Sequence, residues 1–341
     1  MSKQHGMHGR ESGLKKLPAL SPGALAIALL VIVAVTANAA GQDYPAKPIR
    51  WLVPFAPGGV GDLTARIVAK KMTENLRQQI VIDNRPAAGM VLSANLALQA
   101  PPDGYTLVQA GNGSAISQSL FKSLPYDVVR DFTALSTLAY FDIVLVTHAN
   151  SALNSAADVL AYAKKNPGRL SIGTGNIGTT QHLAVQLFTS MANINAQTIP
   201  FKGTPAAISA LRGNEIPLVM ETIPALIGQL RGSALKALAV GSTQRSPILP
   251  DTPTLAESGV PGYEATSWTG LSVKAKTPGA IIARLHREIS AAVNSGEVMQ
   301  KLGDMGATGR TSASPDDARK LMRLEIDKWK VVIDRAGIER Q

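Results

Sequence analysis

Glycine-rich turns provide the groups in this sequence that are best suited to bind a small ligand. Four of them, at 55–62, 110–114, 173–179 and 201–205, follow apolar runs and precede helical patterns. The first turn of a helix has N–H groups without intrahelical partners and the positive end of the helix dipole, which suits carboxylate or phosphate. Glycine also lets a ligand approach the backbone closely. The turns predict an anion site, although strand-to-helix turns need glycine for their geometry alone.

The turn at 173–179 also matches a dinucleotide-binding fingerprint through Gly173, Gly175 and Gly178. That fingerprint requires an acidic residue about 20 positions later to hold the ribose. The sequence has none around Thr198. The phosphate-binding P-loop motif is missing from the sequence as well. We therefore expect no nicotinamide, flavin or other cofactor.

Groups for catalysis are sparse. After the N-terminal segment the histidines are His148, His182 and His286, and none has a partner at a metal-ligand spacing. Asp62 falls where a carboxylate stabilises the first turn of a helix, and hydrogen bonding to loop backbone is the simpler role for His182. The chain has no cysteine and no G-x-S-x-G motif. We expect no catalytic and no metal-binding residue. The alternative is an exported hydrolase that uses Asp62, His182 or Glu221.

The charge balance excludes one class of partner. The formal net charge is +10, but the cationic runs are no longer than pairs such as Lys70-Lys71, and aromatic residues make up 4%. A nucleic-acid-binding protein is expected to combine a basic stripe with stacking rings, so we expect no nucleic-acid partner. The excess charge indicates a mild preference for anionic partners. The absence of cysteine excludes disulfides and a lipid-modified N-terminal cysteine.

The N-terminal segment has the pattern of a secretory signal peptide. Residues 1–22 are polar and cationic, residues 23–35 are apolar, and Ala37-Asn38-Ala39 suits a signal peptidase. The apolar run is shorter than the roughly 20 residues of a transmembrane helix, which argues against the alternative of an uncleaved anchor. We predict a signal peptide at 1–39, cleavage after Ala39 and a periplasmic location.

The rest of the sequence alternates short apolar runs with helical patterns, which predicts an α/β fold with parallel sheets. Ser155 and Asp158 form a capping box for one helix, and the last helix begins after Ser314. Glycine-rich turns in such a fold lie at the carboxyl ends of the strands, where ligands bind. The predicted strands lie at 49–55, 79–83, 105–110, 143–147, 170–172, 198–201, 216–220, 235–240 and 268–273.

Several motifs together resemble the solute receptors of the tripartite tricarboxylate transporters, also called the Bordetella uptake gene (Bug) proteins. The motifs are YPAKPIRWLVPFAPGGVGDLTAR at 44–66, NRPAAG at 84–89, APPDGYTL at 100–107, AYAKKNPGRLSIGTGNIGTTQHLAVQLF at 161–188, PFKGTPAA at 200–207 and LKALAVGSTQRSPILPDTPTLAESGVPGYE at 235–264. The resemblance implies a type II periplasmic binding protein. Its two lobes of mostly parallel sheet, flanked by helices, are joined by two crossing strands.

The resemblance also implies domain boundaries and a site. Lobe one would comprise 43–143 plus 264–341, and lobe two 144–263, with a carboxylate held by the turns at 55–62 and 173–179. From the turns and the resemblance together, the expected ligand-binding residues are Phe55, Gly58, Gly59, Val60, Gly61, Asp62, Asn112, Ser114, Thr174, Asn176, Gly178, Thr179, His182, Phe201, Gly203, Thr204 and Glu221.

Some positions depart from the family pattern, namely Thr174, Asn176, Pro217 and Met220. They affect the identity of the ligand more than the fold. The sequence therefore predicts a monomeric, non-enzymatic receptor that binds a small carboxylate (a di- or tricarboxylate, an amino acid or an aromatic acid) and delivers it to the permease subunits of a tripartite tricarboxylate transporter. A receptor for a sensor kinase is the second interpretation, because both roles use the surface of the closed lobes.

Overall fold

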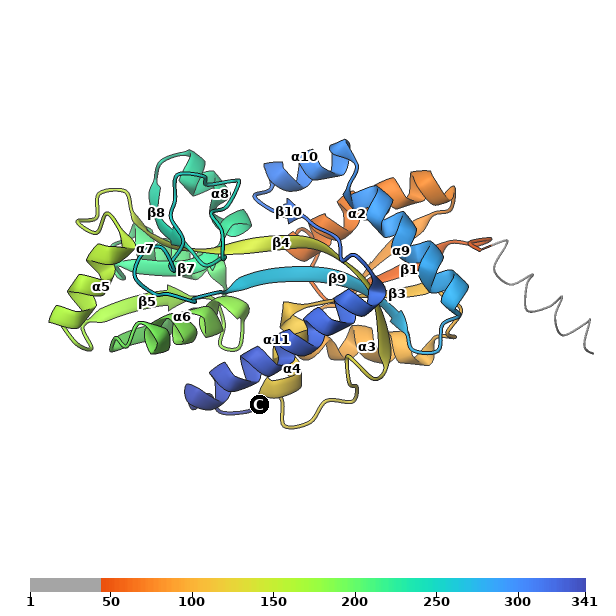
Figure 1. The fold of residues 1–341 in the computed structure, drawn as a ribbon, viewed down its shortest axis with the longest axis horizontal. Coiled ribbons are helices and arrows are strands. Elements are labelled where there is room, and N and C mark those ends of the chain that lie inside the picture. Colours follow the sequence, from red (N-terminus) through yellow and green to blue (C-terminus); the bar gives the residue numbers. More distant parts are fainter. Residues whose placement is uncertain (1–43) are drawn as a thin grey trace, which may run out of the picture. The chain divides into compact units, whose positions relative to one another are not determined.

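The computed structural model describes residues 44–341, and the predicted signal peptide at 1–39 lies outside the described residues. Residues from Pro45 onward form one unit (Figure 1). Its strands are β1 (Ile49–Val53), β2 (Ile80–Asn84), β3 (Thr106–Gly111), β4 (Phe132–His148), β5 (Leu170–Thr174), β6 (Ala196–Pro200), β7 (Leu218–Thr222), β8 (Leu235–Val240), β9 (Thr266–Lys274) and β10 (Thr308–Gly309).

The helices alternate with these strands along most of the chain. They are α2 (Val60–Leu76), η1 (Ala88–Met90), α3 (Val91–Gln99), α4 (Asn112–Leu120), α5 (Ala156–Lys165), α6 (Thr180–Met191), α7 (Thr204–Arg212), α8 (Ile223–Arg231), α9 (Gly279–Val293), α10 (Gly296–Asp304) and α11 (Pro315–Arg335). Within 44–341, none of them combines the length and the apolar character needed to cross a bilayer.

The predicted α/β class is confirmed, but the sheet is mixed. The strand order is β2-β1-β3-β9-β4-β7-β5-β6, and β8 and β10 also pair with β4. Strand β1 pairs in parallel with β2 and β3, and β5 with β6 and β7. Strands β4 and β9, between these parallel groups, are antiparallel to each other and to their outer neighbours. The two parallel groups and the two strands between them agree with the predicted mostly parallel sheet and its two crossing strands.

Strand β4 connects the two parallel groups. Its residues from Phe132 to Asp142 pair with β9, and those from Ile143 onward pair with β7 and β8. Figure 1 shows β4 and β9 running side by side between the two groups of helices. The sequence predicted only 143–147 as a strand, because the first half of β4 includes buried polar residues such as Ser136 and Thr137 and lacks a continuous apolar run.

Hydrophobic clusters fix the helices on both parts of the sheet. One cluster joins β1, β3 and β9 to α3 through residues such as Leu52, Val108 and Trp268. A second cluster includes Leu120 of α4, Leu183 of α6 and residues of α11, so these three helices share a core. In Figure 1, α11 lies along α4. Burial of such side chains contributes about 25 cal/mol per Å² of apolar surface, which holds the helix starts in fixed positions.

The helix caps follow the predicted pattern. Ser155 accepts a hydrogen bond from the Asp158 N–H at 3.1 Å, and the Asp158 carboxylate accepts one from the Ser155 N–H at 3.0 Å, which confirms the capping box. Ser314 caps α11, because its Oγ atom accepts a hydrogen bond from the Asp317 N–H at 3.1 Å. Each cap satisfies N–H groups that the first helical turn leaves without partners, and so defines where the helix begins.

Candidate functional site

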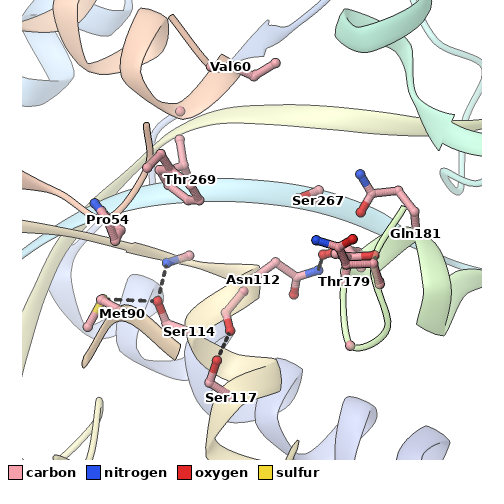
Figure 2. A pocket seen from close by; sticks show the side chains of 18 of the residues that line it. Pro54, Val60, Met90, Asn112, Ser114, Ser117, Thr179, Gln181, Ser267 and Thr269 are labelled. Carbon is pink, nitrogen blue, oxygen red and sulfur yellow. Dashed lines mark hydrogen bonds between the residues drawn. The ribbon is translucent and has the colours of Figure 1, made fainter. Parts of the chain in front are cut away.

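The first turns of five helices surround a cavity of about 620 Å³. Helices α2 and α4 start after β1 and β3, on one side of the crossing strands, and helices α6, α7 and α8 start after β5, β6 and β7 on the other. Figure 2 shows this cavity, whose lining includes Ser267 and Thr269 of β9 as well as Val60 of α2 and Thr179 before α6. Because five helix starts converge on one cavity, it is the candidate site.

Most of the predicted ligand-binding residues line this cavity. They are Phe55, Gly59, Val60, Gly61, Asn112, Ser114, Asn176, Gly178, Thr179, Thr204 and Glu221. The structure places the others outside the lining, namely Gly58, Asp62, Thr174, His182, Phe201 and Gly203. Several of these residues form hydrogen bonds within the turns and hold the turns in shape.

Asp62 shapes the turn before α2. It is 1% exposed, and its Oδ2 atom accepts hydrogen bonds from the Gly58 N–H at 2.8 Å and from Arg66 Nε at 2.9 Å. Its Oδ1 atom accepts one from Asn84 Nδ2 at 2.8 Å. Burial acts to raise the pKa of Asp62, but these hydrogen bonds outweigh it and leave the pKa below its ordinary value. The carboxylate of Asp62 is therefore bound by groups of the protein, and the expected ligand contacts of Gly58 and Asp62 stay predictions.

Side chains from distant segments hold the first residue of α4. The Nδ2 atom of Asn112 donates to Thr180 Oγ1 and to the Thr266 carbonyl oxygen, both at 3.1 Å. Its Oδ1 atom accepts a hydrogen bond from Trp329 Nε1 at 2.8 Å. Asn112 is fully buried, so each of these bonds replaces one to water. The side chain links α4, α6, α11 and β9 at the cavity wall.

Close packing brings the rest of this turn to the cavity. An added Cβ at Gly111 would lie 2.3 Å from the Trp268 carbonyl oxygen, so only glycine allows β3 to approach β9 here. Ser114 Oγ accepts a hydrogen bond from the Gly111 N–H at 3.3 Å and donates to Met90 Sδ at 3.3 Å, as Figure 2 shows. A Cβ at Gly113 would meet no atom within 4 Å. The first-turn backbone of α4 therefore lies open to the cavity.

The turn before α6 requires glycine at one position. Gly178 has φ of +78°, and an added Cβ would lie 2.3 Å from Leu120 Cδ2. Thr179 Oγ1 accepts a hydrogen bond from the His182 N–H at 3.3 Å, and His182 Nδ1 accepts one from the Gly178 N–H at 3.5 Å. Burial lowers the pKa of His182 below its ordinary value. His182 is thus a neutral acceptor that holds the turn, which is the structural role that the sequence favoured.

The remaining residues outside the lining support the same turn and its neighbour. The buried Thr174 hydroxyl donates to the Gly175 carbonyl at 2.9 Å. The Gly203 N–H donates to Asn176 Oδ1 at 3.0 Å, which ties the turn before α7 to the turn before α6. Phe201 packs against a hydrophobic cluster beside α7 and α8. These contacts hold the two turns in shape, and the expected ligand contacts of the three residues stay predictions.

Glu221 is the charged side chain of the cavity. It is the fourth residue of β7 and 1% exposed. Its Oε1 atom accepts hydrogen bonds from Gln181 Nε2, from the Thr222 N–H at 2.6 Å and from Thr222 Oγ1 at 3.1 Å. Its Oε2 atom accepts one from Thr204 Oγ1 at 2.5 Å. These donors belong to the starts of α6, α7 and α8, so one carboxylate joins all three helix starts.

Sequence reasoning missed the polar residues that strands and first helical turns add to the wall. Gln109, Thr269, Ser267 and Gln181 all line the cavity. Gln109 Nε2 donates to Thr269 Oγ1 at 2.8 Å and to the Gly61 carbonyl at 3.1 Å, while its Oε1 atom has no partner. Gln109 was the signal in the sequence that could have identified this part of the wall, because it is a polar residue within an otherwise apolar strand. A buried polar side chain requires hydrogen-bond partners.

The arrangement suits binding of a small polar molecule. Among residues 44–341, no lysine or arginine lines the cavity, so the donors for an anion are backbone N–H groups, hydroxyls and amides. Of the residues named for a hydrolase, Glu221 lines the cavity, whereas Asp62 is paired with Arg66 and both Asp62 and His182 lie outside the lining. The geometry therefore supports recognition by converging helix starts.

Comparison with known proteins agrees with this geometry. Residues 64–338 match the family described as the tripartite tricarboxylate transporter family receptor, TctC. The protein BugT of Bordetella pertussis is 33% identical over 89% of this chain and 93% of its own length. The structure of Rpa4515 of R. palustris with adipate has a TM-score of 0.76 at 32% identity and covers 87% of this chain and 99% of its own. MatC of Rhodopseudomonas palustris with bound malate has a TM-score of 0.71 at 28% identity, covering 85% and 100%.

Proposed function

Since the chain belongs to the tripartite tricarboxylate transporter receptor family, we propose that it is a periplasmic receptor that binds a small carboxylate in the cavity between two lobes. One observation carries the proposal: five helix starts, from both sides of β4 and β9, face one cavity whose lining, as far as residues 44–341 form it, includes no lysine or arginine. Backbone N–H groups at helix starts bind carboxylate without a cation. The adipate and malate of the two solved relatives support the same class of ligand.

The proposed mechanism is closure of two lobes around the ligand. Lobe one comprises 43–143 plus 264–341, and lobe two comprises 144–263. The change of partners along β4, from β9 up to Asp142 to β7 from Ile143, supports this division. A ligand that contacts both lobes stabilises the closed form by its differential affinity for it. The closed receptor then delivers the ligand to the permease subunits without chemical change. The segment at 1–39 directs export and is removed.

The test begins with ligand carried through purification. Protein purified under native conditions is denatured, and the released small molecules are identified by mass spectrometry. Candidates, and a panel of mono-, di- and tricarboxylates, are then titrated while the melting temperature is recorded. A ligand of the native state raises the melting temperature with its concentration. The proposal fails if no carboxylate in the panel or in the released material does so, or if a bound compound is converted to product.

Closure is tested separately by small-angle X-ray scattering. The radius of gyration of the ligand-free protein is compared with that at saturating concentration of the ligand found above. A decrease supports closure of the lobes. An unchanged radius would leave the receptor proposal intact and overturn the hinge mechanism.

A further inference from the structure

We propose that the ligand carries a cationic nitrogen group as well as its carboxylate, and that Glu221 is the partner of that cation. The inference rests on the proposed function and makes it more specific: the ligand is an amino-carboxylate rather than a dicarboxylate. Glu221 lines the cavity at the starts of α6, α7 and α8, whereas α2 starts after β1, in the other parallel group of the sheet.

The first step is that Glu221 has no cationic partner within 44–341. Its donors are an amide, two hydroxyls and a backbone N–H, from Gln181, Thr204 and Thr222. A carboxylate has about four acceptor positions on its two oxygen atoms. Of the donors named above, only the Thr204 hydroxyl binds Oε2 of Glu221. Burying a charged carboxylate costs free energy unless a partner compensates its charge. A ligand ammonium is such a partner.

Asp62 provides the internal comparison. It is equally buried and also lies at a helix start, but Arg66 pairs with it at 2.9 Å, and it lies outside the cavity lining. The two carboxylates thus differ in whether the protein supplies a cation that pairs with them. One is neutralised by the protein itself, while the other faces the cavity with neutral donors only.

The second step concerns the charge at the starts of α6, α7 and α8. The positive ends of their dipoles already face the carboxylate of Glu221, which their residues hold by hydrogen bonds. A second carboxylate placed there would be repelled by the carboxylate of Glu221. This end of the cavity therefore disfavours a ligand carboxylate and favours a cation.

The third step places the ligand carboxylate at the other end. The first-turn N–H groups of α2 at Val60 and Gly61 line the cavity, and helical geometry gives them no intrahelical acceptor. Asp62 accepts from the Gly58 N–H, before the helix, and leaves these groups free. A zwitterionic ligand therefore matches the polarity of the cavity from end to end.

The experiment compares matched ligands by isothermal titration calorimetry. The dicarboxylates succinate, glutarate and adipate are paired with γ-aminobutyrate, δ-aminovalerate and ε-aminocaproate, in which an aminomethyl group replaces one carboxylate. Each is titrated into the wild-type protein, Glu221→Gln and the control Glu215→Gln. Glu215 is exposed, so the control makes the same chemical change and the same change in net charge outside the cavity.

For at least one chain length, we expect the amino acid to bind the wild type at least about tenfold more tightly than its dicarboxylate. Glu221→Gln should abolish this preference, and Glu215→Gln should retain it. Tighter binding of the dicarboxylates by the wild type at every length overturns the inference and leaves the proposed receptor function standing, whether or not Glu221→Gln folds. A preference that persists in Glu221→Gln also overturns it. If no compound of either series binds, the inference fails. The receptor proposal is then tested by the wider carboxylate panel that is titrated while the melting temperature is recorded.

Discussion

Asn112 of α4 and Thr180 of α6 are joined by a hydrogen bond of 3.1 Å across the wall of the cavity. The two residues follow strands that lie in different parts of the sheet, and both line the cavity. The same amide side chain also binds Trp329 of α11 and the Thr266 carbonyl. Asn112 therefore couples the position of the helix starts to the packing of the last helix.

Replacing Asn112 with alanine should destabilise the protein and weaken binding. The change removes three buried hydrogen bonds and leaves the Thr266 carbonyl without this donor, so we expect a loss of about 1–3 kcal/mol in the free energy of unfolding. Urea denaturation measures it. The exposed Asn195→Ala is the control and should change stability by less than about 0.5 kcal/mol. Equal stability of the two variants would contradict the structural role of Asn112.

Leucine at Gly59 should block the site without unfolding the protein. Gly59 has φ of −72°, and an added Cβ would lie 3.4 Å from the Ala56 carbonyl oxygen, so the backbone accepts a side chain. Because Gly59 lines the cavity, the leucine side chain would occupy space for the ligand. We expect affinity for the identified ligand to fall at least about tenfold in calorimetry. The free energy of unfolding should change by less than about 1 kcal/mol.

Gly178→Ala, unlike Gly59→Leu, should destabilise the protein. Its φ of +78° and the contact of an added Cβ with Leu120 at 2.3 Å both oppose a side chain. We expect a loss of stability of about 1–3 kcal/mol, because the turn before α6 must distort. Thermal and urea unfolding measure this loss. If Gly59→Leu proved the less stable of the two variants, the assigned roles of the two glycines would be wrong.

Asparagine at Asp62 should lower stability at neutral pH by about 2 kcal/mol, since it removes the charge that Arg66 and the Gly58 N–H bind. The folded pKa of Asp62 is lowered, so its contribution is present above the ordinary value of 3.8 and is lost as the pH falls through the folded pKa. The difference in the free energy of unfolding between wild type and Asp62→Asn should therefore become smaller at acidic pH. The matched control Asp334→Asn changes an exposed ion pair and should have an effect below about 1 kcal/mol.

His182 should make the protein less stable as the pH falls. Its folded pKa lies below the ordinary 6.5, so the unfolded chain binds a proton first. Stability should therefore decrease as the pH falls from about 6.5 towards the folded pKa, and it should be retained above this window. Urea unfolding across that range should show a smaller slope for His182→Gln than for wild type.

The sequence was informative wherever a local pattern determines the structure. The turns at 55–62 and 173–179 were found because glycine before a helical pattern marks a strand-to-helix turn, and the capping box at Ser155 defined a helix start to the residue. The first half of β4 was missed because its buried serine and threonine interrupt the apolar run from which a strand is predicted.

The site was predictable only in part, because sequence spacing does not give side-chain direction. Asp62 and His182 lie on the correct turns, yet their polar atoms bind Gly58 and Gly178 within the protein. Trp329 meets Asn112 across 217 positions, a contact that no short motif encodes. Tertiary packing alone brings such residues together.

The placement of the tryptophans makes the protein its own optical probe. The chain has three tryptophans, and all lie in the described part: Trp268 lines the cavity, Trp329 donates to a side chain of the cavity wall, and Trp51 is buried in the strand that leads to the turn before α2. Indole emission depends on the polarity around the ring. Occupation of the cavity should therefore change the intrinsic fluorescence without any attached dye.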